Sequence, residues 1–178
     1  MHVNDSYATT FHQLLRHEAR RRLFEESFPR LKKCLELLSE EQIWQRPNSE
    51  LSSVGNLVLH LCGNIRQWLI SGLGGAEDER NRASEFAHSV PISRANLINM
   101  LDALQEDAEE TLSNIDLARL MKVVTIQGFR ETGVSVLVHV IEHASYHVGQ
   151  VTWYTKLVTE KDLGYYSGLD LSQKNPAT

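Results

Sequence analysis

Three histidines follow one another at intervals of four residues in the last third of the chain: His139, His143 and His147. In a helix, a step of four residues turns about 40° beyond one full turn and climbs about 6 Å, so all three rings lie on one stripe. Two imidazoles four residues apart can bind the same zinc, nickel, copper or iron ion from a single helix. The spacing is therefore compatible with a metal site.

The helix that carries this stripe must also supply apolar side chains to a core. Val136, Val140, Val151 and either Tyr146 or Val148 can do so, and three titratable rings are an unusual choice for packing alone. A buried imidazole also costs free energy unless its nitrogens have partners. The spacing by itself leaves three interpretations open: a metal site, structural histidines with hydrogen-bond partners, and a metal-free acid–base site.

A third metal ligand would have to come from another helix, and His60 is the candidate. It lies between Leu59 and Leu61 in an apolar stretch, with Asn56 and Asn64 four residues away on either side. A lone histidine in such a place is more often a hydrogen-bonded core residue than a ligand. Together with the C-terminal histidines, however, it is better explained as a ligand. No role is expected for the histidines in polar or terminal contexts, which are His2, His12, His17 and His88.

Apolar residues at intervals of three and four predict four main helices to position these side chains. The predicted helices span residues 11–38, 53–71, 93–115 and 134–158. Ser52 or Ser53 can cap the second helix, and Pro29 predicts a kink or short break near Phe28 in the first. A short extended or hairpin segment is expected within 120–132, and residues 76–89 are expected to form an exposed polar loop. The predicted fold is an all-α four-helix bundle.

Composition limits the class of protein. The 178 residues, 42% hydrophobic and 23% charged, fit one domain covering 1–178. No apolar run approaches the roughly 20 residues that span a membrane, and the N-terminus lacks a secretory signal, so we expect no membrane partner and a cytoplasmic location. The net charge of −5 argues against a nucleic-acid partner. We expect a solvated helix face where basic residues cluster, at Arg16, Arg20, Arg21 and Arg22.

The stretch Glu142–Gln150, Glu-His-Ala-Ser-Tyr-His-Val-Gly-Gln, followed by Val151–Lys156, closely resembles the last-helix signature of the DinB-like superfamily. The resemblance is strongest to a branch of small uncharacterised bacterial proteins, and it extends over nearly the whole chain. Further matching elements are Leu57–Leu61 with Asn64 and Trp68 in the second helix, and Tyr166–Leu171 in the tail.

This resemblance implies a four-helix bundle, usually a homodimer, with a divalent metal on His60, His143 and His147. Zinc or nickel is expected as the metal, with iron or copper as alternatives. His139 is expected either to hydrogen-bond to one of the ligand histidines or to serve as an alternative ligand. Better-known relatives include thiol-dependent enzymes, such as bacillithiol S-transferases and mycothiol-dependent maleylpyruvate isomerase. The resemblance also suggests that Gly149 allows close helix approach and that Gln150 orients neighbouring groups.

Two main hypotheses for function follow. The first is a metal-dependent enzyme with coordination open to water or a low-molecular-weight thiol, acting as a thiol S-transferase or a hydrolase. Its catalytic residues are unknown, with Asn64, Glu142, Tyr146 and Gln150 as candidates, although Glu142 points about 100° away from His143. The second hypothesis is a non-catalytic dimeric bundle with a structural metal, serving as a stress-response or interaction module. A nucleic-acid binder is suggested only by the damage-inducible name of the family.

Overall fold

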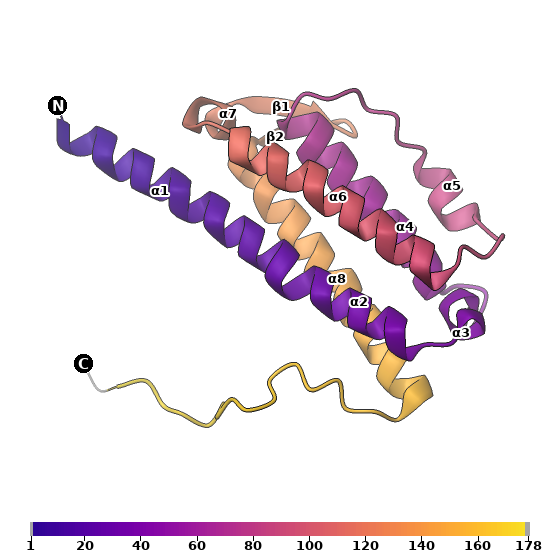
Figure 1. The fold of residues 1–178 in the computed structure, drawn as a ribbon. Helices are drawn as coiled ribbons and strands as arrows, with labels where there is room; N and C mark the ends of the chain where they lie inside the picture. The colour runs from indigo at the N-terminus through magenta and orange to yellow at the C-terminus, as the bar shows by residue number, and fades with distance from the viewer. Residues whose placement is uncertain (1, 177–178) are drawn as a thin grey trace.

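Four long helical segments form the body of the molecule in the computed structural model, which describes residues 2–176 and side chains from residue 6 onward (Figure 1). The first segment comprises α1 (His2–Arg20), the π-helical stretch η1 (Arg21–Ser27) and α2 (Phe28–Leu37). The second comprises α4 (Val54–Ile65) and the π-helical η2 (Arg66–Leu73). The third is α6 (Arg94–Asn114) and the fourth is α8 (Gly133–Thr159). The predicted helical bundle is confirmed.

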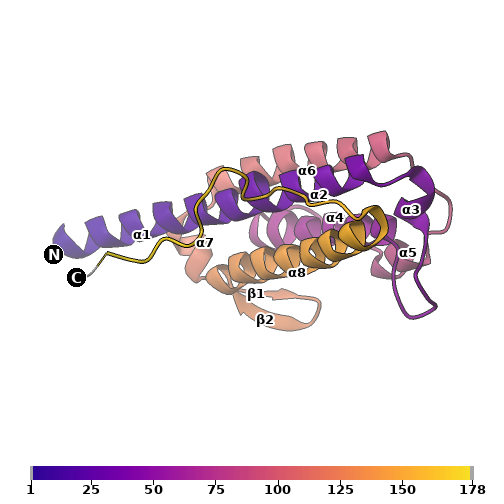
Figure 2. The ribbon, with the colours of Figure 1, turned by 90° about the horizontal axis from the view of Figure 1, so that it is seen from below.

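The order of the four segments around the bundle determines which side chains can meet. Both α2 and α4 pack against α8 and against α6, so α2 and α4 lie at opposite corners. The two views in Figures 1 and 2 show the same arrangement, with the C-terminal tail running back along the bundle after α8. Because α4 and α8 are neighbours, side chains near the middle of each can face one another. Among the described residues, no helix is long and apolar enough to cross a membrane.

Hydroxyl side chains cap the N-termini of α4 and α8, the two helices that carry the candidate metal ligands. Ser53 accepts a hydrogen bond from the amide of Asn56 at the start of α4, and Thr132 accepts one from the amide of Ser135 at the start of α8. Each satisfies a backbone donor that has no partner inside its helix. The second helical segment ends at Leu73 and is followed by Gly74 as its C-cap and by Gly75, and glycine is a residue type that commonly ends helices.

Of the kink or short break expected near Phe28, the break is absent, because the helix continues through η1 into α2. The helix does depart from regular α geometry there, in the π-helical turn of η1. In this π-helical stretch the amide of Phe28 bonds to the carbonyl of Leu23, five residues earlier. The widened turn leaves room for the ring of Pro29 in the first turn of α2, although proline has no backbone donor for the preceding turn. The proline is therefore accommodated without interrupting the helix.

Three short helices complete the helical part: α3 (Glu40–Trp44), α5 (Arg82–Ala87) and α7 (Leu117–Met121). The expectation that residues 76–89 form an exposed loop is wrong in its middle. Asn81 caps α5 by accepting a hydrogen bond from the amide of Ser84, and Glu85 within this helix is buried. The segment folds onto α4, where Glu85 contacts His60.

The predicted extended segment is a two-stranded antiparallel hairpin of β1 (Val123–Ile126) and β2 (Phe129–Thr132). Its two-residue turn places Gln127 at φ 52° and Gly128 at φ 83°, the left-handed backbone of a tight hairpin turn. The indole of Trp68 donates a hydrogen bond to the side-chain oxygen of Gln127, 3.2 Å away. The hairpin thereby covers one end of the second bundle helix.

The basic cluster near the end of α1 is an ion-paired helix face, as its interleaved charges predict. Arg21 and Arg22 both bond to Glu18, and these hydrogen bonds lower the pKa of that carboxyl to about 2. Glu25 and Glu26 pair with the same group of arginines. The positive charges are therefore balanced within the chain.

Glycines on two bundle helices have opposite surroundings. A Cβ atom added at Gly149 would meet no atom within 4 Å, so the expectation that Gly149 allows close helix approach is wrong for this chain. Its backbone faces open space on the outer side of α8. Close approach occurs at Gly55 instead, where an added Cβ would lie 2.7 Å from the indole ring of Trp44.

We expect Gly149→Ala to raise the free energy of unfolding by about 1 kcal/mol, because alanine is the better helix former and the added methyl group meets nothing. The matched change Gly55→Ala should lower it, since Trp44 or the helix must move. Thermal and urea unfolding of the two variants measures the difference. Destabilisation by Gly149→Ala would contradict the open surroundings of this glycine.

Candidate metal centre

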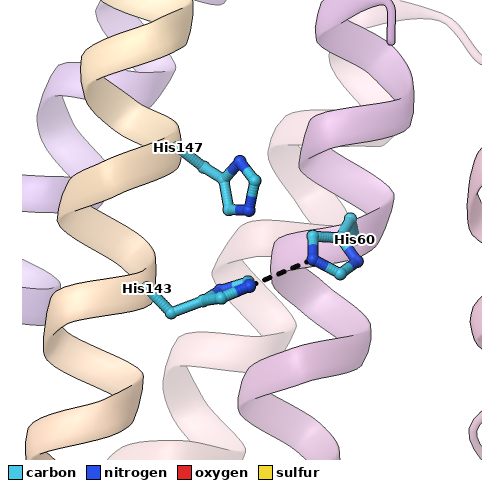
Figure 3. A group of neighbouring side chains, drawn as sticks. All are labelled: His60, His143 and His147. Atoms are coloured by element: carbon cyan, nitrogen blue, oxygen red, sulfur yellow. Dashed lines mark hydrogen bonds between the residues drawn. The ribbon is translucent and has the colours of Figure 1, made fainter.

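His60 from α4 and His143 and His147 from α8 converge between the two helices (Figure 3). One nitrogen from each ring lies within 4.8 Å of those of the other two, and Nε2 of His60 lies 3.0 Å from Nε2 of His143. His60 and His147 are buried, and His143 is half-buried. The structure thus brings together the three histidines that the sequence singles out.

A buried ion pair holds the far side of the His60 ring. Nδ1 of His60 lies 2.9 Å from Oε2 of Glu85, and Arg80 donates to both oxygens of that carboxylate at 2.7 and 2.9 Å. Nη2 of Arg80, which can only donate, also lies 3.1 Å from Nδ1 of His60, but this atom of Arg80 already donates to Glu85. The shorter contact with the carboxylate, which can only accept, assigns the hydrogen to Nδ1 and leaves the lone pair on Nε2, which faces the other histidines. A carboxylate behind a metal-binding imidazole fixes its tautomer and orientation in this way.

Gly63, one helical turn after His60, makes room for this carboxylate. A Cβ atom at position 63 would lie 2.0 Å from Oε1 of Glu85. The carboxylate cannot swing aside freely, because Arg80 and His60 both hold it. A glycine at this position in α4 is therefore a condition for the contact between Glu85 and His60.

The rings of α8 are held differently from His60. Nδ1 of His147 donates to the side-chain oxygen of Gln150, 2.7 Å away, so Nε2 is the nitrogen left for an ion. With the lone pair of His60 Nε2 turned inward, Nε2 of His143 donates the 3.0 Å hydrogen bond between these two rings. Nδ1 of His143 is buried and has no hydrogen-bond partner among the described residues. Two of the three rings, His60 and His147, therefore have their Nε2 lone pair free of a hydrogen.

Burial keeps these imidazoles neutral. Desolvation lowers the pKa of His143 to about 3, assisted by the neighbouring rings of His147, His60 and His139. Desolvation likewise lowers the pKa of His60 and of His147, against opposing hydrogen bonds from Glu85 and Gln150. A neutral imidazole is the form that binds a metal, so protons compete weakly for these nitrogens at neutral pH.

The donor set fits a divalent transition metal. Tetrahedral Zn–N bonds of about 2.0–2.1 Å place two ligand nitrogens about 3.3 Å apart. The separations here, 3.0 Å for one pair and at most 4.8 Å within the group, allow all three to reach one ion after small side-chain rotations. The rings are neutral, Nε2 of His60 and of His147 present lone pairs, and Glu85 supports His60 from behind, as such a site requires. His143 could bind an ion through Nε2 once the hydrogen on that atom moves to the unpartnered Nδ1.

His139 lies beside this group rather than in it. Its ring stacks on Trp68, with centroids 3.7 Å apart, and its Nε2 accepts a hydrogen bond from the amide of Asn64 at 3.3 Å. Its centroid is 5.5 Å from that of His143. Asn64 is buried but reaches His139, so this pair flanks the candidate metal centre on one side.

The remaining candidate catalytic residues are spread around the site. Tyr146 is 63% exposed, and its ring packs edge-to-face against His147 with centroids 5.0 Å apart. Gln150 contacts His147 directly. Glu142 is exposed and lines a different cavity, beside Arg22 and Arg30. Tyr146 and Gln150 therefore lie next to the three histidines, and Glu142 does not.

A family model described as "Protein of unknown function (DUF1572)" matches residues 13–168. The chain belongs to this family. No curated protein matches it.

Solved structures show where the DUF1572 fold belongs. A DinB-like protein from Bacillus cereus superposes with a TM-score of 0.62 at 19% identity, covering 78% of this chain and 90% of the other. A DinB-like protein from Bacillus subtilis superposes with a TM-score of 0.61 at 17% identity, covering 89% and 99%. The resemblance to the DinB-like superfamily is confirmed at the level of the fold.

Sequence reasoning missed three residues at the site of this DUF1572 protein: Arg80, Glu85 and Phe86. Besides the ion pair, the ring of Phe86 packs on His60 with centroids 4.7 Å apart. All three lie in the charged segment that was expected to be exposed. Two local signals were present there: Asn81 as a helix cap, and Phe86 as the one large apolar side chain that a purely solvated loop would not need.

We expect Glu85→Gln to weaken metal binding about 10- to 100-fold, because the His60 ring loses the charged partner that orients it. Gly63→Ala should also weaken metal binding, because the added methyl group displaces the Glu85 carboxylate although the charges of Glu85 and Arg80 remain. Competition titration with a metal-sensitive dye measures the affinity, and circular dichroism checks the fold. Glu79→Gln, an exposed change in the same segment, is the control. Wild-type affinity in both test variants would rule out this role of Glu85.

The neutral histidines also predict how acid affects the metal-free protein. Between pH 6.5, the ordinary value, and about 3, the value for His143, the unfolded chain binds more protons than the folded one. Stability is therefore full above about pH 6.5 and declines as the pH falls below it. We expect the Tm of chelator-treated protein to drop by several degrees from pH 7 to pH 5, and less in His143→Gln. An equal fall in Tm with pH in the wild type and in His143→Gln would contradict the lowered pKa of His143.

Proposed function

We propose that this DUF1572 protein is a metal-dependent enzyme that holds one divalent transition metal on His60, His143 and His147. The observation that carries the proposal is the convergence of three neutral imidazoles, one of which lies in the wall of a cavity. Within the described residues, the group offers three protein ligands. Three protein ligands with a position left open is the arrangement of catalytic zinc, whereas structural zinc is closed by four. When bound, such an ion lowers the pKa of a coordinated water or thiol.

The identity of the metal is part of the proposal. An all-imidazole donor set suits zinc, nickel, copper and iron. We propose zinc or nickel first, with iron or copper as alternatives. The absence of a carboxylate from the three-residue group speaks against magnesium or calcium, which prefer oxygen ligands.

The residues around the three rings have separate tasks in this proposal. Glu85 orients His60 and Gln150 orients His147, so both rings keep their Nε2 atoms directed inward. Tyr146, exposed beside His147, can donate a hydrogen bond or a proton to a molecule bound there. Asn64 and His139 form the opposite flank of the site and hold the position of the α8 rings.

We propose thiol S-transfer or hydrolysis as the reaction, since both use an activated water or thiol at an open site. The thiol-dependent enzymes of the DinB-like superfamily favour a low-molecular-weight thiol. We further propose that the protein acts in the cytoplasm as a homodimer, with no nucleic-acid or membrane partner.

One observation favours the alternative, a non-catalytic dimeric bundle with a structural metal. Large apolar side chains are exposed along the outer face of α8, where another protein could cover them: Val138, Tyr146, Trp153 and Leu157. The access from a cavity to His147 favours the enzyme instead, because a structural site gains nothing from it.

Elemental analysis of protein purified without an affinity tag tests the metal proposal. We expect about one divalent transition-metal ion per chain in the wild type, and a small fraction of that in His143→Ala. His17→Ala is the control, because this histidine lies outside the group. Equal metal content in the wild type and His143→Ala would overturn the proposed centre.

The reaction is tested separately, on protein shown to carry metal. Bacillithiol and glutathione are offered with a panel of electrophilic acceptors and with activated esters. We expect turnover in the wild type that chelation abolishes and that His143→Ala lacks. Absence of metal-dependent turnover across the panel would favour the non-catalytic alternative.

A further inference from the structure

A cavity of about 630 Å³ opens beside the candidate metal centre, between α8, the start of α4 and the chain that precedes it. Its volume lies in the ordinary range for a small-molecule site, about 300–1,000 Å³. His147 is the one member of the histidine group in its wall, and Phe86, which packs on His60, lies there as well. A molecule in this cavity would therefore touch the candidate metal centre at one end.

The walls of the cavity are mainly apolar and aromatic. Leu51, Leu57, Trp153 and Tyr154 supply most of this character, together with Phe86. Flat aromatic walls suit a flat or bulky apolar group, because such a group excludes water from several rings at once. The polar groups are few and lie toward His147, where Tyr146 and Gln150 can orient a reacting end.

The charge of the cavity is as informative as its apolar character. Glu50 supplies the one formal charge in the lining, and no lysine or arginine takes part. A second cavity, of about 660 Å³ on the other side of α5, is rich in charged residues but contains none of the three histidines. An anionic molecule would thus enter the cavity beside His147 without a cation to pair with, and against the charge of Glu50.

We propose that this cavity binds the uncharged apolar or aromatic part of the substrate, with the reacting end directed at His147. Anionic molecules bind there more weakly than neutral ones, because the lining holds Glu50 and no lysine or arginine. The claim that the bound molecule is a substrate rests on the proposed function; the claim that the cavity selects neutral apolar molecules does not.

Gly149 is the position at which this selection can be tested. It lines the cavity, and a side chain added there would project into space that no protein atom occupies within 4 Å. Gly149→Leu therefore adds a bulky side chain at the rim of the cavity without displacing its walls. Leucine is also the better helix former, so the variant is expected to fold.

The experiment uses two probes with the same ring system, 2-naphthylmethanol and 2-naphthoate, which differ in charge. Their binding to the full-length protein as purified is measured by isothermal titration calorimetry. We expect the neutral probe to bind at least about tenfold more tightly than the anion, since the anion meets Glu50 with no cation. We expect Gly149→Leu to weaken the neutral probe at least about tenfold. Ser145→Leu, an exposed change on α8 outside the cavity lining, should leave binding unchanged.

Several results would overturn the proposal. One is that the wild type binds the anion as tightly as the neutral probe, or more tightly. Another is that Gly149→Leu binds the neutral probe as tightly as the wild type does. A third is that Ser145→Leu loses as much affinity for the neutral probe as Gly149→Leu does. A wild-type dimer that binds neither probe, and that Gly149→Leu converts to monomers in light scattering, would show that a second copy occupies the cavity. That result also overturns it.

Repeating the titrations after chelation, with metal content measured on the same samples, separates this proposal from the proposed function. Selective binding of the neutral probe that survives chelation supports the cavity whether or not a metal is found. Metal bound at about one ion per chain without probe binding would refute the cavity proposal alone. Probe binding by protein that is found to carry no metal as purified, before any chelation, would refute the metal-dependent enzyme alone.

Discussion

Burial of three imidazole rings between α4 and α8 is the constraint on which the rest of the site depends. Taking a polar ring out of water costs free energy unless its nitrogens are paired. Each ring here meets that cost differently: His60 through Glu85, His147 through Gln150, and His143 by sharing a hydrogen with His60. One nitrogen, Nδ1 of His143, stays unpaired among the described residues. An all-apolar helix contact would have avoided these costs, so the arrangement is better explained by what the inward lone pairs can bind.

This constraint extends beyond the two helices that carry the histidines. Burial of the Glu85 carboxylate depends on Arg80, which neutralises its charge, and on His60, which donates a hydrogen bond to it. The ion pair and the position of the His60 ring therefore depend on one another. The segment that carries them is also fixed to α4 by its backbone. Asn56 donates to the carbonyls of Glu85 and His88, at 2.9 and 3.0 Å, and Arg46 donates to the carbonyl of Phe86 at 2.6 Å. The α5 segment is thus a fixed wall of the site.

Periodicity and caps were sufficient to predict the four long helical segments, but not the short helices or which elements lie next to one another. The apolar repeat, the Ser53 cap and the glycines near Gly74 locate the second bundle helix closely, because those signals are local. That α4 lies beside α8 and diagonal to α2 depends on how long connections cross the bundle, which local patterns do not encode. Burial of Glu85 was hidden for the same reason, since its partner His60 is 25 residues away. The prediction of close helix packing at Gly149 was wrong, because a glycine within a helix can lie either at a close contact or against open space.

The outer face of α8 brings the two hypotheses for function into direct conflict. Tyr146, Gly149 and Trp153 are exposed there, and the same residues line the cavity that reaches His147. A partner packed on this face would bury the aromatic rings but close the way to the candidate metal centre. A homodimer that remains an enzyme must therefore associate through a different surface. The α1 helix exposes one, with Tyr7, Phe11 and Leu14 spaced by four and three residues on one side. A partner on the α8 face would thus seal the candidate metal centre, whereas association through α1 would leave it accessible.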